Sequence, residues 1–418
     1  ASGPMVQTGF EPAFVMLKCT TASGTSWRIV DNKINTSNPR NKYLEPQSAQ
    51  VEYTYDQLNF YSNGFQVITT DTSINASGSN VIYLAIAADG STATPSLANS
   101  FATEIYTGNG GAQSITGVGF KPDFTWIKNT TGYGHSQVLS NSVRPIGSFL
   151  ISNSTNAEVA STGLSSFDSD GFSMASGATN AIDETNFEFV SWNWKAGGTP
   201  SINTDGTITS LFSANQAAGF SVVSYTGNNT QGATIGHGLD SIPNMIIVKG
   251  IDSTSAYNWM VYASPLGRKH AYINLTNAFE GTATGTGIWA SDPTSSVFST
   301  SNNVNVNVNN AGYIAYCFTS ISGYSKVGSY QGSTNNVSVT TGFQPTFILV
   351  KNTTSAGNWT LWDNKRGGTY FLQPNNSGAQ GSGRTVTFDS NGFTVDTNGG
   401  VNSNSNGDTF IYLAIKQN

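Results

Sequence analysis

Five carboxylates in the second quarter of the chain are of the type that glycoside hydrolases use. Asp168 and Asp170 lie in FDSDGF, and Asp183, Glu184 and Glu188 lie in AIDETNFEF. Paired acids at a set separation can protonate a glycosidic bond and activate water or form a covalent intermediate. However, Asp168 has a counterpart in Asp389, and a tight turn between two strands explains both. We therefore predict that the chain is not an enzyme.

Metal and thiol chemistry find no support in the spacing of histidines and cysteines. His135, His237 and His270 have no second histidine three or four residues away, which argues against a zinc site. Cys19 and Cys317 are too few and too far apart for a disulfide framework, so we predict two free thiols that are buried or half-buried. No metal and no cofactor are expected.

Aromatic side chains beside amide groups are the remaining candidates for a binding site, because sugars are held by ring faces and hydrogen bonds. Trp259 and Trp359 recur at one place in the repeats described below, which predicts that they are core residues. Tyr257, Trp289 and Trp362 are specific to one copy and are predicted to face outward. The candidates for glycan contact are Tyr257, Tyr262, Trp289 and Trp362.

The composition indicates life outside cells or in particles. Only 10% of the 418 residues are charged, and Gly, Ser, Thr and Asn replace them. The net charge of −6 and the scattering of the 18 Lys and Arg disfavour nucleic acid, which needs a clustered basic patch. No run reaches the ~18 apolar residues of a membrane span, so no membrane insertion is expected.

One sequence element occurs four times and organises the chain. A Gly-apolar turn is followed by a proline and by an apolar run that ends in lysine. The lysines are at positions 18, 128, 249 and 351, which gives a period of about 100 residues, too long for a solenoid. The run is typical of a buried strand, and its lysine is predicted to emerge into water. The copies are GFEPAFVMLK (9–18), GFKPDFTWIK (119–128), GLDSIPNMIIVK (238–249) and GFQPTFILVK (342–351).

Other strands recur in a fixed order around this element. An aromatic-centred strand follows it, as in WRIVD, NWMVY and NWTLWD, with HSQVL as the divergent copy. Asn-Gly or Asp-Gly hairpins come next in FYSNGF, FDSDGF and FDSNGF, and an alternating strand such as VIYLAIA or FIYLAIK closes each copy. An opening strand precedes copies two to four but not copy one. We expect truncation or cleavage of a longer chain there, rather than a strand donated by a neighbouring subunit.

This pattern predicts an all-β protein. Short strands with turn signals between them, and no convincing helical period, are typical of antiparallel β-sandwiches. We predict four tandem sandwich domains of about 100 residues each, with jelly-roll, lectin-like topology preferred over immunoglobulin-like connections. The ranges are 1–88 (repeat 1, without the opening strand), 102–197 (repeat 2), 219–320 (repeat 3) and 324–418 (repeat 4). The last two are expected to dock stiffly, and the other junctions to be freer.

These motifs together resemble a repeated domain in virion structural proteins of tailed phages, especially marine and cyanobacterial phages. The resemblance rests on SYTGNxxxGATIGHGL, PNMIIVK, NWMVY and YIAYCFTSISGYSKVGSYQG in repeat 3, KPDFTWIKN and SWNWKAGG in repeat 2, and GFQPTFILVKN and FIYLAIK in repeat 4. It implies a tail-fibre or other virion role and supplies no catalytic residue.

The resemblance and the composition together predict a virion protein that is assembled in the host cytoplasm. A tail fibre or similar appendage would contribute to host-surface attachment through polysaccharide, with other virion proteins and copies of itself, as in a trimer, as partners. Two alternatives stay open: a capsid-surface decoration or head fibre protein that binds no receptor, and a cell-surface adhesin or filament subunit.

Overall fold

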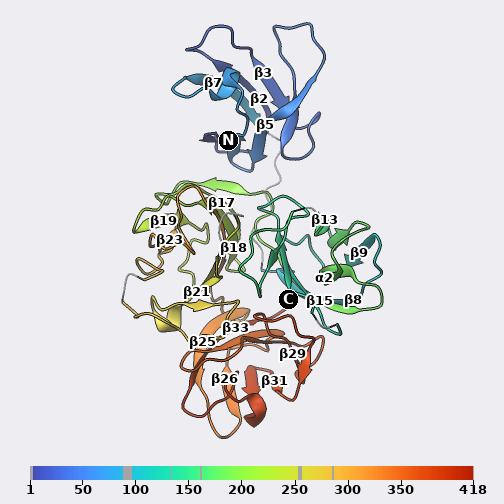
Figure 1. The fold of residues 1–418 in the computed structure, drawn as a ribbon, viewed down its shortest axis with the longest axis vertical. Helices are drawn as coiled ribbons and strands as arrows, with labels where there is room; N and C mark the ends of the chain where they lie inside the picture. Colours follow the sequence, from blue (N-terminus) through green and yellow to red (C-terminus); the bar gives the residue numbers. More distant parts are fainter. Residues whose placement is uncertain are drawn as a thin grey trace. The chain divides into compact units, whose positions relative to one another are not determined.

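The computed structural model describes residues 3–87, 97–132, 134–160, 162–252, 257–284 and 287–417. The fold is all-β, built from antiparallel sheets with two short α-helices and two 3₁₀ turns, which confirms the predicted class (Figure 1). The chain divides into two compact units. Unit 1 comprises Ala1–Ala93 with Thr199–Ile202, and unit 2 comprises Thr94–Gly198 with Asn203–Asn418. The outer bounds Ala1, Ala88 and Asn418 of the predicted domains lie outside the described residues.

Unit 1 holds repeat 1, whose sheets run in the orders β3-β2-β7 and β1-β6-β5-β4. Its helix is α1 (Thr72–Asn75), which Asp71 caps by accepting from the backbone N–H of Ser73. The strands are β1 (Met5–Gln7), β2 (Pro12–Cys19), β3 (Arg28–Asp31), β4 (Arg40–Tyr43), β5 (Tyr53–Tyr61), β6 (Gly64–Val67) and β7 (Val81–Ala87).

Unit 2 holds the other three repeats. Repeat 2 comprises β8 (Phe101–Thr107), β9 (Gln113–Thr116), β10 (Phe124–Asn129), β11 (Val138–Asn141), β12 (Leu150–Ile151), β13 (Leu164–Asp168), β14 (Gly171–Met174), α2 (Asn180–Asp183) and β15 (Glu188–Trp194). The bridge to repeat 3 carries β16 (Ser201–Asn203) and β17 (Ser210–Asn215). Repeat 3 comprises β18 (Phe220–Thr226), β19 (Ala233–Gly236), β20 (Met245–Gly250), β21 (Met260–Ala263), η1 (Ser264–Leu266), β22 (Ala271–Tyr272), β23 (Val297–Thr300) and β24 (Gly312–Phe318). Repeat 4 comprises β25 (Ser325–Gln331), β26 (Val337–Thr340), β27 (Phe347–Asn352), β28 (Thr360–Asp363), β29 (Tyr370–Phe371), β30 (Gly381–Ser382), β31 (Val386–Asp389), β32 (Gly392–Val395), η2 (Thr397–Gly399) and β33 (Thr409–Ile415).

The repeated element forms an inner strand of the main sheet in each copy, with a neighbouring strand on both sides. In unit 2 the closing strand lies between the opening strand and the repeated element, in the orders β8-β15-β10-β11, β18-β24-β20-β21 and β25-β33-β27-β28. Unit 1 has the same order as β7-β2-β3, and within residues 3–87 no strand takes the opening position. The turn that starts the element needs a left-handed residue, and Gly9, Gly119, Gly238 and Gly342 have φ of 79°, 83°, 71° and 94°.

A second sheet packs on the main sheet within each repeat, and in repeats 2 to 4 it is the smaller of the two. In repeat 2, the β13–β14 hairpin pairs Asp168 with Gly171, as the Asp-Gly signal predicts. Ile115 and Phe172 of this sheet share an apolar cluster with Ile127 and Phe189 of the main sheet. Each main sheet therefore has one apolar face that its own repeat covers.

The opposite faces of the three main sheets in unit 2 meet in one shared core. This cluster contains side chains from all three repeats. The ribbons of the three repeats, coloured teal to green, yellow-green to yellow-orange and orange to red, lie around a common centre (Figure 1). The rings of Phe124 and Tyr316 are tilted to each other with centroids 4.3 Å apart, and the ring centroids of Trp194 and Phe347 are 5.7 Å apart. Repeats 2 to 4 are therefore not a string of separate beads, and the expectation that only the last two dock tightly is wrong.

We expect Trp194→Ala to destabilise unit 2 by about 3–5 kcal/mol, because it opens a cavity where the three sheets meet. Trp194 is 2% exposed. Denaturant unfolding, followed by fluorescence and circular dichroism, measures the loss. Tyr370→Ala is the control, since Tyr370 is 42% exposed and its loss should cost less than about 0.5 kcal/mol. Equal effects of the two changes would contradict a shared core.

Candidate functional site

The aromatic candidates for glycan contact are all buried. The exposed fractions are 1% for Tyr257, 4% for Tyr262, 1% for Trp289 and 0% for Trp362. The prediction that Tyr257, Trp289 and Trp362 face outward is therefore wrong. Tyr262, Trp289 and Trp362 lie in the apolar clusters of their own repeats, and Tyr257 is buried beside repeat 2, where its backbone N–H donates to the carbonyl of Thr155 at 3.1 Å. Trp362, for example, donates from Nε1 to the carbonyl of Arg384 at 3.1 Å. None of the four rings offers a free face to a sugar.

The carboxylates of repeat 2 tie loops together. Asp170 accepts from the backbone N–H groups of Gly119 and Gly117 at 2.6 and 3.1 Å, and Asp183 accepts from that of Asn109 at 2.8 Å. Asp168 accepts from the hydroxyl of Ser166 and Glu188 from that of Thr107, and Glu184 Oε2 lies 2.6 Å from His135 Nε2. These bonds give the acids structural roles in turns and loop contacts.

Cys19 and Cys317 are buried free thiols, as predicted. His237 is also buried: its Nδ1 accepts from the backbone N–H of Leu239, and its Nε2 lies 3.1 Å from the carbonyl of Thr294. Burial lowers the pKa of His237. Across the described ranges, no group of three or more His, Cys, Asp and Glu side chains gathers in a way that could hold a metal ion.

The lysines that end the repeated element are buried at the junctions between repeats in unit 2. Lys128, Lys249 and Lys351 are 0% exposed, so the prediction that they emerge into water is wrong for these three copies. Each Nζ donates to one carbonyl of its own repeat and to one carbonyl of another repeat. The pairs are His135 (2.6 Å) and Ser377 (3.1 Å) for Lys128, Tyr257 (2.6 Å) and Thr155 (2.8 Å) for Lys249, and Gly357 (2.5 Å) and Thr276 (2.8 Å) for Lys351.

A second hydrogen bond accompanies each lysine. Trp259 donates from Nε1 to the carbonyl of Ile151 at 3.0 Å, and Trp359 to that of Tyr272 at 2.7 Å. Gln137 has the same place in repeat 2, and its Nε2 donates to the carbonyl of Gln373 at 2.8 Å. The recurring tryptophans are 0% exposed, as predicted, but they join repeats in addition to filling cores.

A third bond joins the two main chains at each junction. The backbone N–H groups of Glu158, Phe279 and Gln380 donate to the carbonyls of Ile251, Thr353 and Thr130 at 3.0, 3.3 and 3.0 Å. Repeat 3 thus docks on repeat 2, repeat 4 on repeat 3, and repeat 2 on repeat 4. We call each set of three bonds a ring junction, and the three junctions close a head-to-tail ring within one chain.

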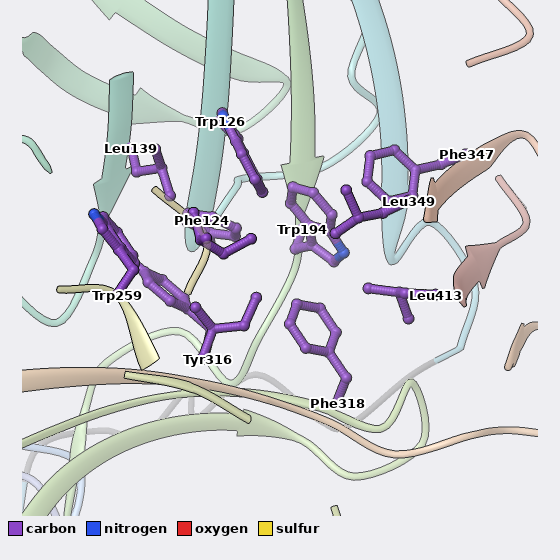
Figure 2. Close-up of a pocket in the computed structure, with 12 residues that line it drawn as sticks. Phe124, Trp126, Leu139, Trp194, Trp259, Tyr316, Phe318, Phe347, Leu349 and Leu413 are labelled. Atoms are coloured by element: carbon purple, nitrogen blue, oxygen red, sulfur yellow. The ribbon is translucent and has the colours of Figure 1, made fainter. Parts of the chain in front are cut away.

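The centre of this ring is nearly filled. Figure 2 shows aromatic and aliphatic side chains of the three repeats pointing toward one another, among them Trp194, Phe318, Phe347 and Leu413. The space left for a water-sized sphere is about 10 Å³, at the lower limit for one water. The centre is a packed apolar core and has no room for a ligand.

Burial changes the proton affinity of the junction lysines. Loss of hydration lowers the pKa of Lys128 and Lys249 to about 8 and that of Lys351 to about 7. A neutral amine still has two N–H donors, which match the two carbonyls that each Nζ contacts. Deprotonation therefore removes the buried charge without removing a hydrogen bond.

Unit 1 carries an apolar sheet face that its own residues leave uncovered. Ile82, Leu84 and Ile86 of β7 are 52%, 50% and 53% exposed. Exposed aliphatic residues in a contiguous set mark a surface for interaction. In the described part of the chain, no helix is long and apolar enough to cross a membrane.

Comparison with known families gives one finding. A family model described as Domain of unknown function (DUF7483) matches residues 1–89 and 96–418, which is nearly the whole chain. No curated protein matches the chain.

The junction lysines predict a pH dependence of stability. Their folded pKa values of about 7 to 8 lie below the ordinary 10.5, so the unfolded chain binds more protons between these values. Stability should therefore rise as the pH increases from 7 toward 10. Burial raises the pKa of Tyr262 and Tyr412 to about 12, so stability should fall once unfolded tyrosines ionise above about pH 10. Thermal melts across this range measure the curve, and a decrease between pH 7 and 9 would contradict it.

Lys351→Met should show how much one junction lysine contributes to the pH dependence of stability. At pH 9 we expect a loss of about 1–3 kcal/mol in unfolding free energy, because buried carbonyls lose their donor. At pH 6 the loss should be smaller, since the native protein then has to bury an ammonium. Lys326→Met is the control: Lys326 donates to the carbonyl of Thr340 at an exposed position, and its loss should matter little at either pH. A loss of equal size at both pH values would argue against the lowered pKa.

Proposed function

The chain belongs to the DUF7483 family, and we propose that it is a structural protein of a tailed-phage virion, in a tail fibre or similar appendage that contributes to host-surface attachment. The sequence motifs of repeats 2 to 4 support the phage role through their resemblance to virion proteins. The composition supports it as well, because only 10% of residues are charged.

The observation that carries a structural role is the closed ring of unit 2. The buried lysines, tryptophans and loop carbonyls of three repeats are used to dock those repeats on one another. Residues of these types would be candidates for chemistry if they lined a cleft, but here they join sheets around a filled core. A rigid body held in this way suits a load-bearing part of a particle.

The same proposal treats the chain as four copies of one lectin-like sandwich domain of about 100 residues. Its support is the strand order that the main sheets share and the glycine turn that begins each repeated element. Because the aromatic candidates are buried, we place host contact on exposed amide and hydroxyl side chains. Many weak contacts of this kind bind a surface through avidity when several copies are present.

Electron cryo-microscopy of the particle that carries this chain tests the role and the location together. We expect unit 2 to project from the tail as a rigid body that fits the density without rearrangement of its three repeats. Density on the capsid lattice would replace the appendage with a decoration role. Absence of the chain from purified particles, measured by mass spectrometry, would overturn the virion proposal.

Attachment is tested separately with the purified chain. We expect it to bind host cells at low occupancy as a monomeric species and far more strongly when displayed in several copies on a bead. Treatment of the cells with periodate, which destroys surface sugars, should remove the binding. Binding that survives periodate would contradict polysaccharide as the receptor.

A further inference from the structure

The uncovered face of unit 1 corresponds to the faces that form the shared core of unit 2. Strand registers define the correspondence: Phe14 pairs with Ile86 as Phe124 pairs with Trp194, and Lys18 pairs with Ile82 as Lys128 pairs with Val190. The same registers in β24 and β33 extend it to repeats 3 and 4. Ile82, Leu84 and Ile86 thus occupy the positions of three buried residues in each other repeat.

The difference in burial between these positions is large. The three β7 residues are about half exposed, whereas their counterparts are at most 6% exposed. The counterparts all belong to the shared core of unit 2, and they are Val190, Trp192 and Trp194 in repeat 2, Ile314, Tyr316 and Phe318 in repeat 3, and Ile411, Leu413 and Ile415 in repeat 4.

The other apolar residues on this face of unit 1 are also more exposed than their counterparts in unit 2. Leu44 bridges to Ile29 as Leu372 bridges to Leu361, and Leu44 is 36% exposed where Leu372 is 1% exposed. Phe14, Met16 and Ile29 are half-buried at positions that lie inside the core in unit 2. We call Phe14, Met16, Trp27, Ile29, Leu44, Ile82, Leu84 and Ile86 the unit 1 face.

Unit 1 also keeps one half of a ring junction. Lys18 donates to the carbonyl of Thr25 in its own loop, as each junction lysine does in its own repeat, and to Thr25 Oγ1 at 3.0 Å. Trp27 has the place of Trp259 and Trp359, and within residues 3–87 its indole N–H has no hydrogen-bond acceptor. The donors of a junction are present, and the acceptors from another repeat are not.

The complementary half of a ring junction is present as well. Gln47 Oε1 accepts from the backbone N–H of Trp27 at 3.2 Å, as Asn274 and Asn375 accept from those of Trp259 and Trp359 at 3.0 Å. Counting from these residues, Glu45 corresponds to the acceptor of the tryptophan, and Ala49 to the acceptor of the lysine. The loop from Glu45 to Glu52 therefore matches the loops 151–158, 272–279 and 373–380 that receive a neighbouring repeat.

We propose that three copies of this chain associate head to tail through the unit 1 face and reproduce between chains the ring that unit 2 forms within one chain. At each junction Trp27 Nε1 and Lys18 Nζ of one copy would donate to the carbonyls of Glu45 and Ala49 in the next copy. The N–H of Glu52 in that next copy would donate back to the carbonyl of Thr20 in the first. One chain supplies both halves of the junction. When three copies are related by a threefold rotation, every donor half therefore meets an acceptor half of the next copy.

Strand addition at the free edge of β7 is a different mode of association. It would pair the backbone of β7, which within residues 3–87 has a strand neighbour only on the side of β2. Because an added strand lies beside β7 in the sheet, it would leave the side chains of Ile82, Leu84 and Ile86 uncovered. The junction donors Lys18 and Trp27 would also stay without acceptors from another copy, so the unit 1 face fits copies of itself better.

Sedimentation velocity and light scattering of the full chain test the proposal. We expect a species of three times the chain mass that dissociates on dilution, and a single mass of one chain for Leu84→Asp. Tyr55→Asp is the matched control, since it places the same charge on a 54% exposed side chain of β5 outside the unit 1 face. This control should remain trimeric. The proposal does not depend on a phage role and can fail or succeed without it.

Two milder substitutions keep the test decisive if Leu84→Asp does not fold. Trp27→Phe preserves apolar surface and removes only the donor to the next copy, whereas Lys18→Met also removes the bonds of Lys18 to Thr25 in its own loop. Each should raise the concentration for half-dissociation at least about tenfold. Circular dichroism checks that both variants are folded. A native chain that is monomeric or dimeric at every concentration overturns the proposal, as does a trimer that both variants leave unchanged.

Discussion

A sheet with two apolar faces has to be covered twice, and the architecture of unit 2 follows from this constraint. The smaller sheet of each repeat covers one face of the main sheet, as Ile115 and Phe172 do in repeat 2. The other face has no cover within its repeat. Three such faces cover one another when they close a ring, because each then packs on two neighbours. Burial of apolar area is worth about 25 cal/mol per Å², so an uncovered face of this size would be costly in water.

The polar groups at the ring junctions are a consequence of that closure. Loop carbonyls that become buried when repeats dock need donors, and lysine reaches two carbonyls at once. A junction residue differs between repeats where the hydrogen bond to the neighbouring repeat and the side-chain volume are both kept. Gln137 replaces the tryptophan of the other repeats and makes the equivalent bond, while Trp126 fills the adjacent space and donates to Gln137 Oε1 at 2.7 Å. Trp126 stands where the other repeats have Ile247 and Leu349.

The sequence predicts most local structure because local structure depends on local patterns. Glycine turns, Asp-Gly hairpins and the order of strands are all found as expected. The predictions that fail mostly concern contacts between repeats. Lys249 follows an apolar run and looks exposed unless a second repeat is known to supply Thr155. Trp362 is specific to one copy and was expected outside, but copy-specific residues also fill cores, since each sandwich packs its own interior.

The side chains at equivalent positions of the two units differ in size, and this difference fits the proposed ring of identical copies. In unit 2 the three positions at one level around the centre are Trp194, Phe318 and Ile415, so a large side chain from one repeat is balanced by smaller ones from the others. Side chains of different size can meet at one level only when one chain supplies all three repeats. A ring of identical copies places the same side chain at a level three times, and three tryptophans would overfill it. Ile86 and Leu84 are of intermediate size, and side chains of this size avoid such overfilling when each occurs three times at one level of the ring of copies that we propose.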